Sequence, residues 1–83
     1  MSYTIYILRS ISCNRFYTGQ THDFDNRIIE HNAGETASLK ACIPWILIWK
    51  TEVLTRSEAM ILERKIKARG ASRYLTDIGI IVQ

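Results

Sequence analysis

The sequence lacks the features that mark several classes of protein. Its 83 residues contain no apolar run near the roughly 18–20 residues that a membrane-spanning helix requires. No basic segment precedes the first apolar stretch, so we expect no secretory signal peptide. Repeats, low-complexity tracts and linkers are also missing, and the length predicts one domain over residues 1–83. We therefore expect a small cytoplasmic protein with a modest core of its own.

Cysteine is scarce, because only Cys13 and Cys42 are present and they stand far apart. A single disulfide is one alternative, but two free thiols are the commoner case in a small cytosolic protein. A zinc site that combines them with His22 and His31 lacks the paired spacing of structural zinc ligands, so we expect none.

The net charge of +3 is mild, but basic residues are concentrated in one segment near the C-terminus that contains no acidic residue. This basic cluster comprises Arg64, Lys65, Lys67, Arg69 and Arg73. Such a cluster attracts phosphate, and the alternative is a solvated helix face.

The first half of the chain predicts a hairpin followed by a helix. Residues Tyr3–Arg9 and Phe16–Gln20 read as strands around a turn, and Gly19 suggests a bulge or a close backbone approach. A helix should run from an N-cap at Asp23 to about Asn32. Its expected core-facing residues are Phe24, Ile28 and Ile29.

The second half predicts a polar connection over Glu35–Ile43 and then a strand over Trp45–Val53. The near-continuous apolar run in that strand indicates a central position with both faces buried. Thr55 and the glutamate three residues later form a capping box for a helix that reaches about Ala68. The apolar stripe of this helix should be Ala59, Leu62 and Ile66.

A last short helix or turn should begin at Ser72 and run through Asp77. The order of elements is then β-β-α-β-α-α. This order predicts an α+β fold with a small three-stranded, mainly antiparallel sheet flanked by helices.

Four side chains could carry chemistry, and each also has an ordinary structural explanation. Glu63 points along the buried stripe, where an unpaired carboxylate is costly, but an ion pair with the residue four positions on would also explain it. Tyr6 and Tyr17 come from neighbouring strands, so their phenols either fill the core or converge. Arg27 has the geometry for phosphate, or is simply solvated.

These residues fall in segments that together resemble the GIY-YIG nuclease family. Thr4-Ile5-Tyr6 and Tyr17-Thr18-Gly19 resemble its two named signatures, although Thr4 replaces a glycine. Asn26–Asn32 resembles the helix that carries an arginine and a histidine one turn later, here His31. Ile61–Lys67 resembles the helix with a metal-binding glutamate. The chain looks most similar to short stand-alone bacterial members, which are similar to the N-terminal nuclease domain of the excision-repair nuclease.

The resemblance implies a role for each matched residue. Glu63 would bind one divalent metal, Mg²⁺ or Mn²⁺, and Arg27 would stabilise developing charge. Tyr6 or Tyr17 would activate water, with His31 as a helper. A nearby cation such as Arg27 should lower the pKa of the tyrosine, which is otherwise a poor base.

Other residues should contact the nucleic acid without taking part in the chemistry. We expect these contacts at Gly19 and at four basic residues, Arg64, Lys67, Arg69 and Arg73. The predicted function is a metal-dependent endonuclease, acting on DNA and directed by structure, with a role in DNA repair. The absence of a second domain implies low sequence specificity, or specificity supplied by a protein partner or a dimer.

Two other functions fit the same sequence. An inactive nucleic-acid-binding module of the same fold would bind without metal and would not cleave. A protein-interaction domain would show no salt-dependent binding to DNA.

Overall fold

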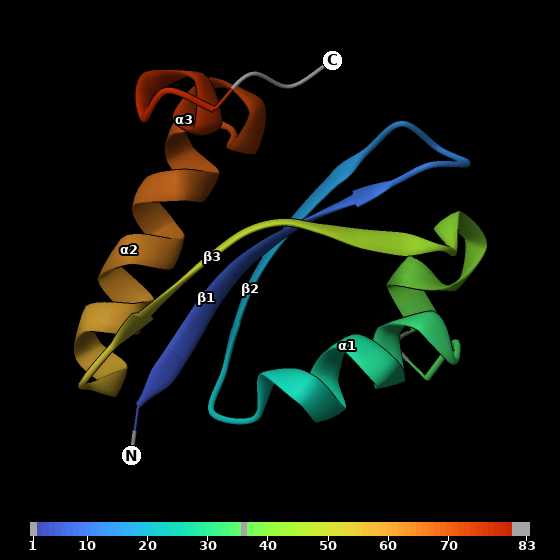
Figure 1. Ribbon diagram of the computed structural model, residues 1–83, viewed down its shortest axis with the longest axis horizontal. Coiled ribbons are helices and arrows are strands. Elements are labelled where there is room, and N and C mark those ends of the chain that lie inside the picture. The colour runs from blue at the N-terminus through green and yellow to red at the C-terminus, as the bar shows by residue number, and fades with distance from the viewer. Residues whose placement is uncertain (1, 36, 81–83) are drawn as a thin grey trace.

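The computed structural model describes residues 2–35 and 37–80 and confirms the predicted α+β fold (Figure 1). Its elements are β1 (Tyr3–Ser10), β2 (Phe16–Thr21), α1 (Phe24–Asn32), the 3-10 helix η1 (Ala37–Cys42), β3 (Trp45–Val53), α2 (Arg56–Arg69) and α3 (Ala71–Asp77). The predicted polar connection therefore contains η1, and its residue Thr36 lies outside the described residues. Of the helices in this part of the chain, none has the length and apolarity needed to cross a bilayer.

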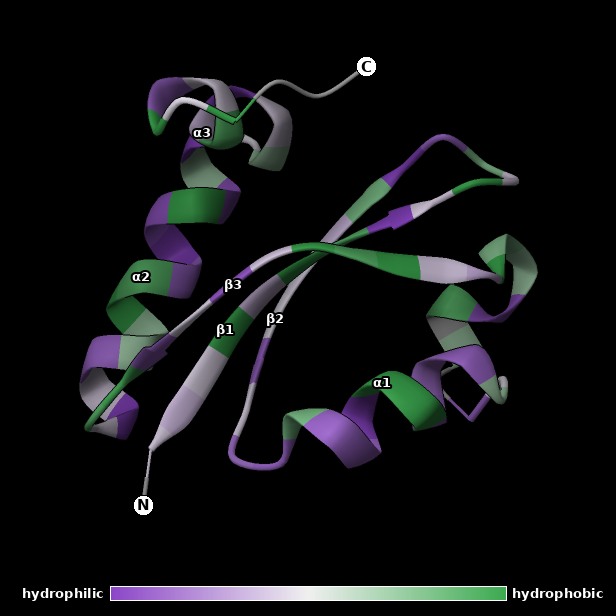
Figure 2. Cartoon of the chain, in the orientation of Figure 1, coloured by the Kyte–Doolittle hydropathy of each residue, from purple (hydrophilic) through white to green (hydrophobic). Residues whose placement is uncertain are grey.

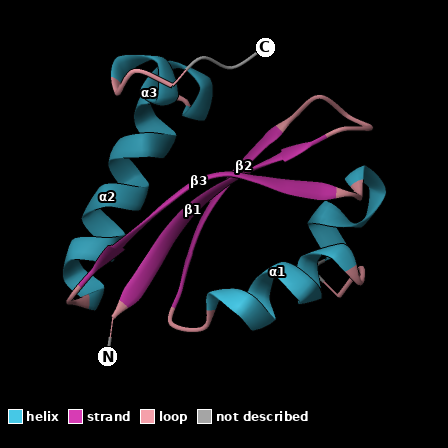
Figure 3. Cartoon of the chain, viewed as in Figure 1, coloured by secondary structure: helices cyan, strands magenta, loops and turns pink. Residues whose placement is uncertain are grey.

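The strand β1 lies at the centre of the sheet, whose order is β2-β1-β3 with both pairings antiparallel. The helices α2 and α3 lie to one side of the sheet, and α1 and η1 lie to the other (Figures 1 and 3). Successive side chains of a strand point to opposite faces. Ile5 and Ile7 of β1 therefore pack toward α2, while Tyr6 and Leu8 pack toward α1.

The prediction that Trp45–Val53 is the central strand is wrong, because β3 is an edge strand. Ile46 is 45% exposed, so the apolar run does not indicate burial on both faces. A bulge shifts the β1–β3 register between Ile7 and Leu8. It allows Trp45 to pack in the core beside α1, while Trp49 packs in the core beside α2.

The apolar residues accordingly form two cores, one on each face of the sheet. Figure 2 shows that hydrophobic positions recur along the strands and along the helices on both sides of the sheet. The α2-side core consists of Ile5, Ile7, Ala59, Ile66 and Leu75. The α1-side core consists of Tyr6, Leu8, Leu39, Cys42 and Trp45. Phe24 and Ile28 of α1 pack against the second core as expected, but Ile29 is 64% exposed and does not.

The helices begin largely where their capping residues predict. The Asp23 and Thr55 side chains accept hydrogen bonds from the backbone N–H groups three residues on, at the starts of α1 and α2. The helix α2 ends at Arg69 and is followed by Gly70, whose φ of 94° favours glycine. The expected start of α3 at Ser72 is wrong, because Gly70 precedes its first turn without a side-chain cap.

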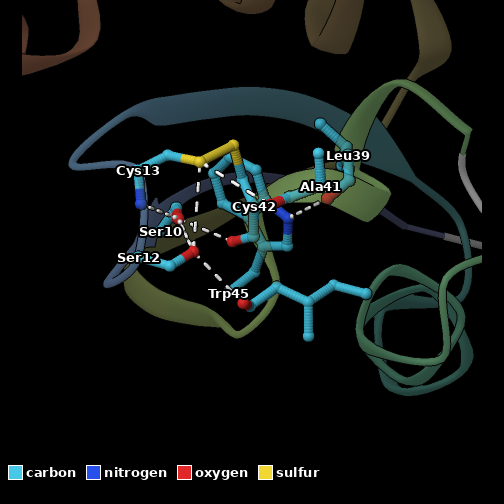
Figure 4. The surroundings of a disulfide bond; sticks show 8 residues. Ser10, Ser12, Cys13, Leu39, Ala41, Cys42 and Trp45 are labelled. Carbon is cyan, nitrogen blue, oxygen red and sulfur yellow. Dashed lines mark hydrogen bonds between the residues drawn. A yellow bond between two sulfur atoms is a disulfide. The ribbon is translucent and has the colours of Figure 1, made fainter.

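The two cysteines form a disulfide, so the expectation of free thiols is wrong. Cys13 in the β1–β2 turn bonds to Cys42 at the end of η1 (Figure 4). The Ser10 hydroxyl donates to the Cys42 carbonyl at 2.5 Å, and the Ser12 hydroxyl donates to the Ile43 carbonyl at 3.2 Å. These bonds hold the turn against η1 and bring together cysteines 29 positions apart, a proximity that no local pattern reveals.

The buried stripe of α2 makes the fold sensitive to truncation at one position. Ile66 is fully buried, whereas Ile61 on the same helix is 68% exposed. Ile66→Ala should lower the free energy of unfolding by about 2–5 kcal/mol, because it leaves a cavity between α2 and the sheet. Ile61→Ala is the matched control and should change it by less than about 0.5 kcal/mol in urea unfolding. Equal losses in the two variants would contradict the placement of this core.

Candidate active site

The site is built around a gap that Gly19 leaves in the edge strand β2. Gly19 lies opposite Tyr6 in the β1–β2 register. A Cβ atom at Gly19 would come within 2.6 Å of the Tyr6 hydroxyl oxygen and 2.9 Å of Tyr17 Cε2. Such contacts are too short for any side chain, so of the two alternatives predicted at Gly19 the structure has a close approach to its backbone, made by the Tyr6 phenol, and an uninterrupted β1–β2 register in place of a bulge. The missing side chain is the space into which the Tyr6 phenol extends.

Tyr6, Tyr17 and His31 form one cluster on the α1 face of the sheet. The Tyr6 hydroxyl and His31 Nε2 are hydrogen-bonded at 2.9 Å, and both residues are almost fully buried. The Tyr17 ring lies 6.2 Å from the Tyr6 ring and 5.3 Å from the His31 ring, measured between centroids. The structure therefore places three of the predicted site residues in mutual contact.

Burial raises the pKa of the Tyr6 phenol well above its usual range, and the neighbouring Tyr17 raises it further. The charge of Arg27 lowers this pKa, but by less than burial raises it. Arg27 therefore acts on the Tyr6 pKa in the expected direction, but burial outweighs it and the phenol is less acidic than a free tyrosine. Burial, and then Arg27, lower the pKa of His31, so its imidazole is neutral at physiological pH. A neutral imidazole can accept a proton.

Arg27 lies on the exposed side of α1 near this cluster. Its guanidinium forms an ion pair with Glu30 one turn later, with Nη1 3.2 Å from Oε2. The charge of Arg27 acts on the ionisation of both Tyr6 and His31. A positive group therefore lies within electrostatic range of the two buried side chains.

Glu63 approaches from the opposite side of the sheet, on α2. Its side chain is only 20% exposed and forms an ion pair with Lys67, whose Nζ lies 3.3 Å from Oε2. Gln20 of β2 donates to the other carboxylate oxygen at 3.5 Å. Because β2 is an edge strand, groups from either face can approach each other around it. The Glu63 charge raises the Tyr6 pKa, so the two residues are within electrostatic range.

The donor set fits one hydrated divalent ion. Within residues 2–35 and 37–80, no group of three or more His, Cys, Asp or Glu side chains could enclose a metal. Magnesium is commonly held by one or two carboxylates, with waters and substrate phosphates as its other ligands. Glu63 supplies one such carboxylate, and the Gln20 amide lies beside it.

A cleft of about 580 Å³ adjoins these residues. It is lined by Tyr3, Gln20, Thr21, His22, Arg27 and Arg56. The sequence interpretation did not include Gln20, His22 or Arg56 in the site. The sequence could have indicated Arg56, because it precedes Glu63 by seven residues. That spacing is about two turns of the same helix, so the two residues lie on the same face.

The basic cluster (Arg64, Lys65, Lys67, Arg69 and Arg73) does not form one continuous surface. Lys67 and Arg69 point about 200° apart around the axis of α2. Arg69 makes two hydrogen bonds to Asp77, at 2.8 and 3.1 Å. Arg64 and Arg73 are exposed, and neither is ion-paired with an acid in the described ranges.

Two comparisons relate the chain to known proteins, and one found nothing. The family model for the GIY-YIG catalytic domain matches residues 2–74. The chain is similar to the UPF0213 protein of Bacillus halodurans, solved by solution NMR, with 28% identity and a TM-score of 0.59. That match covers 95% of this chain and 86% of the other. No curated protein matches the sequence significantly.

The lowered pKa of His31 predicts a loss of stability in mild acid. The unfolded chain binds a proton at His31 near pH 6.5, whereas the folded protein binds it only at lower pH. The free energy of unfolding should therefore fall as the pH drops below 6.5, by at most about 1.4 kcal/mol per pH unit. His31→Gln should remove this component in urea unfolding at several pH values. His22→Gln, at an exposed position, is the control and should retain it. An unchanged slope in the His31 variant would contradict the buried, neutral imidazole.

Proposed function

Because the chain belongs to the GIY-YIG family, we propose that it is a metal-dependent endonuclease that hydrolyses phosphodiester bonds in DNA. The observation that carries this proposal is the contact between Tyr6, Tyr17 and His31 at the β2 edge. A buried phenol needs a hydrogen-bond partner in any fold, but here the partner is an imidazole that can accept a proton, and a second, half-buried phenol lies beside the pair.

The three buried or half-buried side chains would remove a proton from the attacking water. Tyr17 is the more exposed of the two tyrosines, so its phenol is the one that water can reach. The Tyr17 oxygen takes a proton from water as its own proton passes to the Tyr6 oxygen. The Tyr6 proton passes in turn to His31 Nε2 along the 2.9 Å hydrogen bond. The proton rests on the imidazole, so neither phenol has to remain ionised.

Charge that develops on the phosphate would be stabilised by Arg27. Its guanidinium is fixed on one side by Glu30 and still presents donors toward the cleft. Glu63 would hold the divalent ion, Mg²⁺ or Mn²⁺, which when bound supplies Lewis-acid polarisation of the phosphoryl group.

We further propose that recognition depends on substrate shape rather than sequence. Arg64, Lys67 and Arg73 are exposed cations that suit phosphate contacts, which carry no sequence information. Arg69 would have to exchange Asp77 for a phosphate. Gly19 would contribute to the site by leaving room for the Tyr6 phenol that takes part in the relay.

Replacing Glu63 tests the enzyme against an inactive binding module. Glu63→Gln keeps the shape of the side chain and removes the charge that would hold the metal. Cleavage of a branched DNA substrate in Mg²⁺ should fall by several orders of magnitude, since Lewis-acid stabilisation is worth several kcal/mol. DNA binding without metal should hold or improve, because a negative charge near the phosphates is gone.

Lys67→Met separates this effect from loss of the ion pair. It removes the same 3.3 Å contact but keeps the carboxylate. Lys67→Met should lower the stability by a few tenths of a kcal/mol. It should reduce the cleavage rate far less than Glu63→Gln does. Full activity in Glu63→Gln would overturn the mechanism. A wild-type protein that binds DNA but never cleaves it would instead favour the inactive module.

Tyr17→Phe tests the proton relay. The variant keeps the ring but cannot receive the proton of water, so cleavage should fall by about 10²–10⁴. Tyr74→Phe is the matched control, because Tyr74 packs against Trp49 on the far face of the sheet. Its cleavage rate should stay near that of the wild type in the same assay. A Tyr17→Phe variant that cleaves as fast as Tyr74→Phe would exclude Tyr17 as the base.

A further inference from the structure

The cleft beside the candidate active site lies at one end of the sheet, and residues from three separate segments line it. Tyr3 begins β1, Thr21 and His22 lie where β2 leads into α1, and Arg56 begins α2. Figure 1 shows these three points of the chain at the same end of the molecule. The residues of the proton relay do not line this space.

The charges of the cleft are suited to an anion. Two arginines line it, and none of its lining residues within 2–35 and 37–80 carries a carboxylate. Arg27 is partly neutralised by Glu30, but Arg56 has no acid within ion-pair distance in residues 2–35 and 37–80. Two guanidinium groups repel each other across a cleft unless an anion lies between them. The other lining groups are a phenol, an amide, a hydroxyl and an imidazole, all of which can hydrogen-bond to a phosphate or a sugar.

Two residues connect this cleft to the proposed chemistry. Gln20 lines the cleft and donates to Glu63, which is the proposed metal ligand. Arg27 lines the cleft, and its charge acts on Tyr6 and His31. An anion in the cleft would therefore be a direct neighbour of the reacting phosphate.

The spacing along α2 indicates that an anion bound in the cleft would be a neighbour of the reacting phosphate and not the reacting phosphate itself. Arg56 and Glu63 are seven residues apart, which is about 10 Å along the helix axis. The cleft volume of about 580 Å³ lies within the range of roughly 300–1,000 Å³ typical of sites that enclose a small molecule. It therefore has room for one phosphate together with its sugar.

We propose that this cleft binds the nucleotide that flanks the scissile phosphate, and that Arg56 anchors the phosphate of that nucleotide. The inference rests on the proposed nuclease function, and it assigns to Arg56 a positioning role for the substrate strand. His22 and Thr21 supply further hydrogen-bonding groups at the same subsite.

Arg56→Gln tests the subsite through kinetics and through binding. Removing one phosphate contact should raise KM for a labelled branched DNA about tenfold and change kcat by less than about twofold, because the residue binds ground state and transition state alike. In metal-free buffer the slope of log K against log salt should become shallower by about 0.9. Arg15→Gln is the control, since Arg15 is exposed in the β1–β2 turn, and it should behave as wild type.

The kinetic measurement and the binding measurement together distinguish a failure of this inference from a failure of the proposed function. If the wild type cleaves and Arg56→Gln matches Arg15→Gln in KM and in salt slope, the subsite is excluded and the nuclease stands. If kcat falls while KM holds, Arg56 acts on the reacting phosphate and the flanking assignment is wrong. If the wild type does not cleave, the proposed function fails, and the salt slope alone decides whether Arg56 contacts a phosphate.

Discussion

The hydrogen bond between the Tyr6 hydroxyl and His31 Nε2 is the contact on which both the α1-side core and the candidate site depend. Both residues are almost fully buried, so either polar group without a partner would destabilise the fold by about 1–3 kcal/mol. The same burial keeps the phenol protonated and the imidazole neutral. The protonation states that the proposed relay requires are therefore those that the packing imposes.

The edge position of β2 is what would let groups from the two faces of the sheet act on one substrate in the proposed mechanism. Gly19 and Gln20 are adjacent in the strand, so they face opposite sides. The first opens space for Tyr6 beside α1, and the second contacts Glu63 beside α2. In a central strand, neighbouring backbone would separate the two faces, and no substrate could reach both.

Features that depend on local pattern could be predicted from the sequence, and those that depend on tertiary contacts could not. The alternation of β1, the capping of α2 at Thr55 and the close approach at Gly19 all follow from short-range rules. The bulge that turns Trp45 and Trp49 to opposite faces depends on pairing with β1, and no periodicity in the apolar run reveals it. The disulfide required η1 to pack against a distant turn. The candidate site could be predicted in part, because helical spacing alone puts Arg27 and His31 on one face of a helix. The cleft could not be predicted, because three separate segments of the chain assemble it.

The molecule separates its fixed groups from its adaptable ones. The phenols and the imidazole are packed among aromatic rings, so their relative geometry is set before any substrate arrives. The cations available for phosphate, Arg56, Arg64 and Arg73, lie on exposed helix surfaces where long side chains can change rotamer. Proton transfer tolerates little displacement, whereas phosphate contacts tolerate much. If the proposed function holds, a domain arranged in this way would keep its reaction geometry constant and would adapt to the shape of the nucleic acid through the exposed cations.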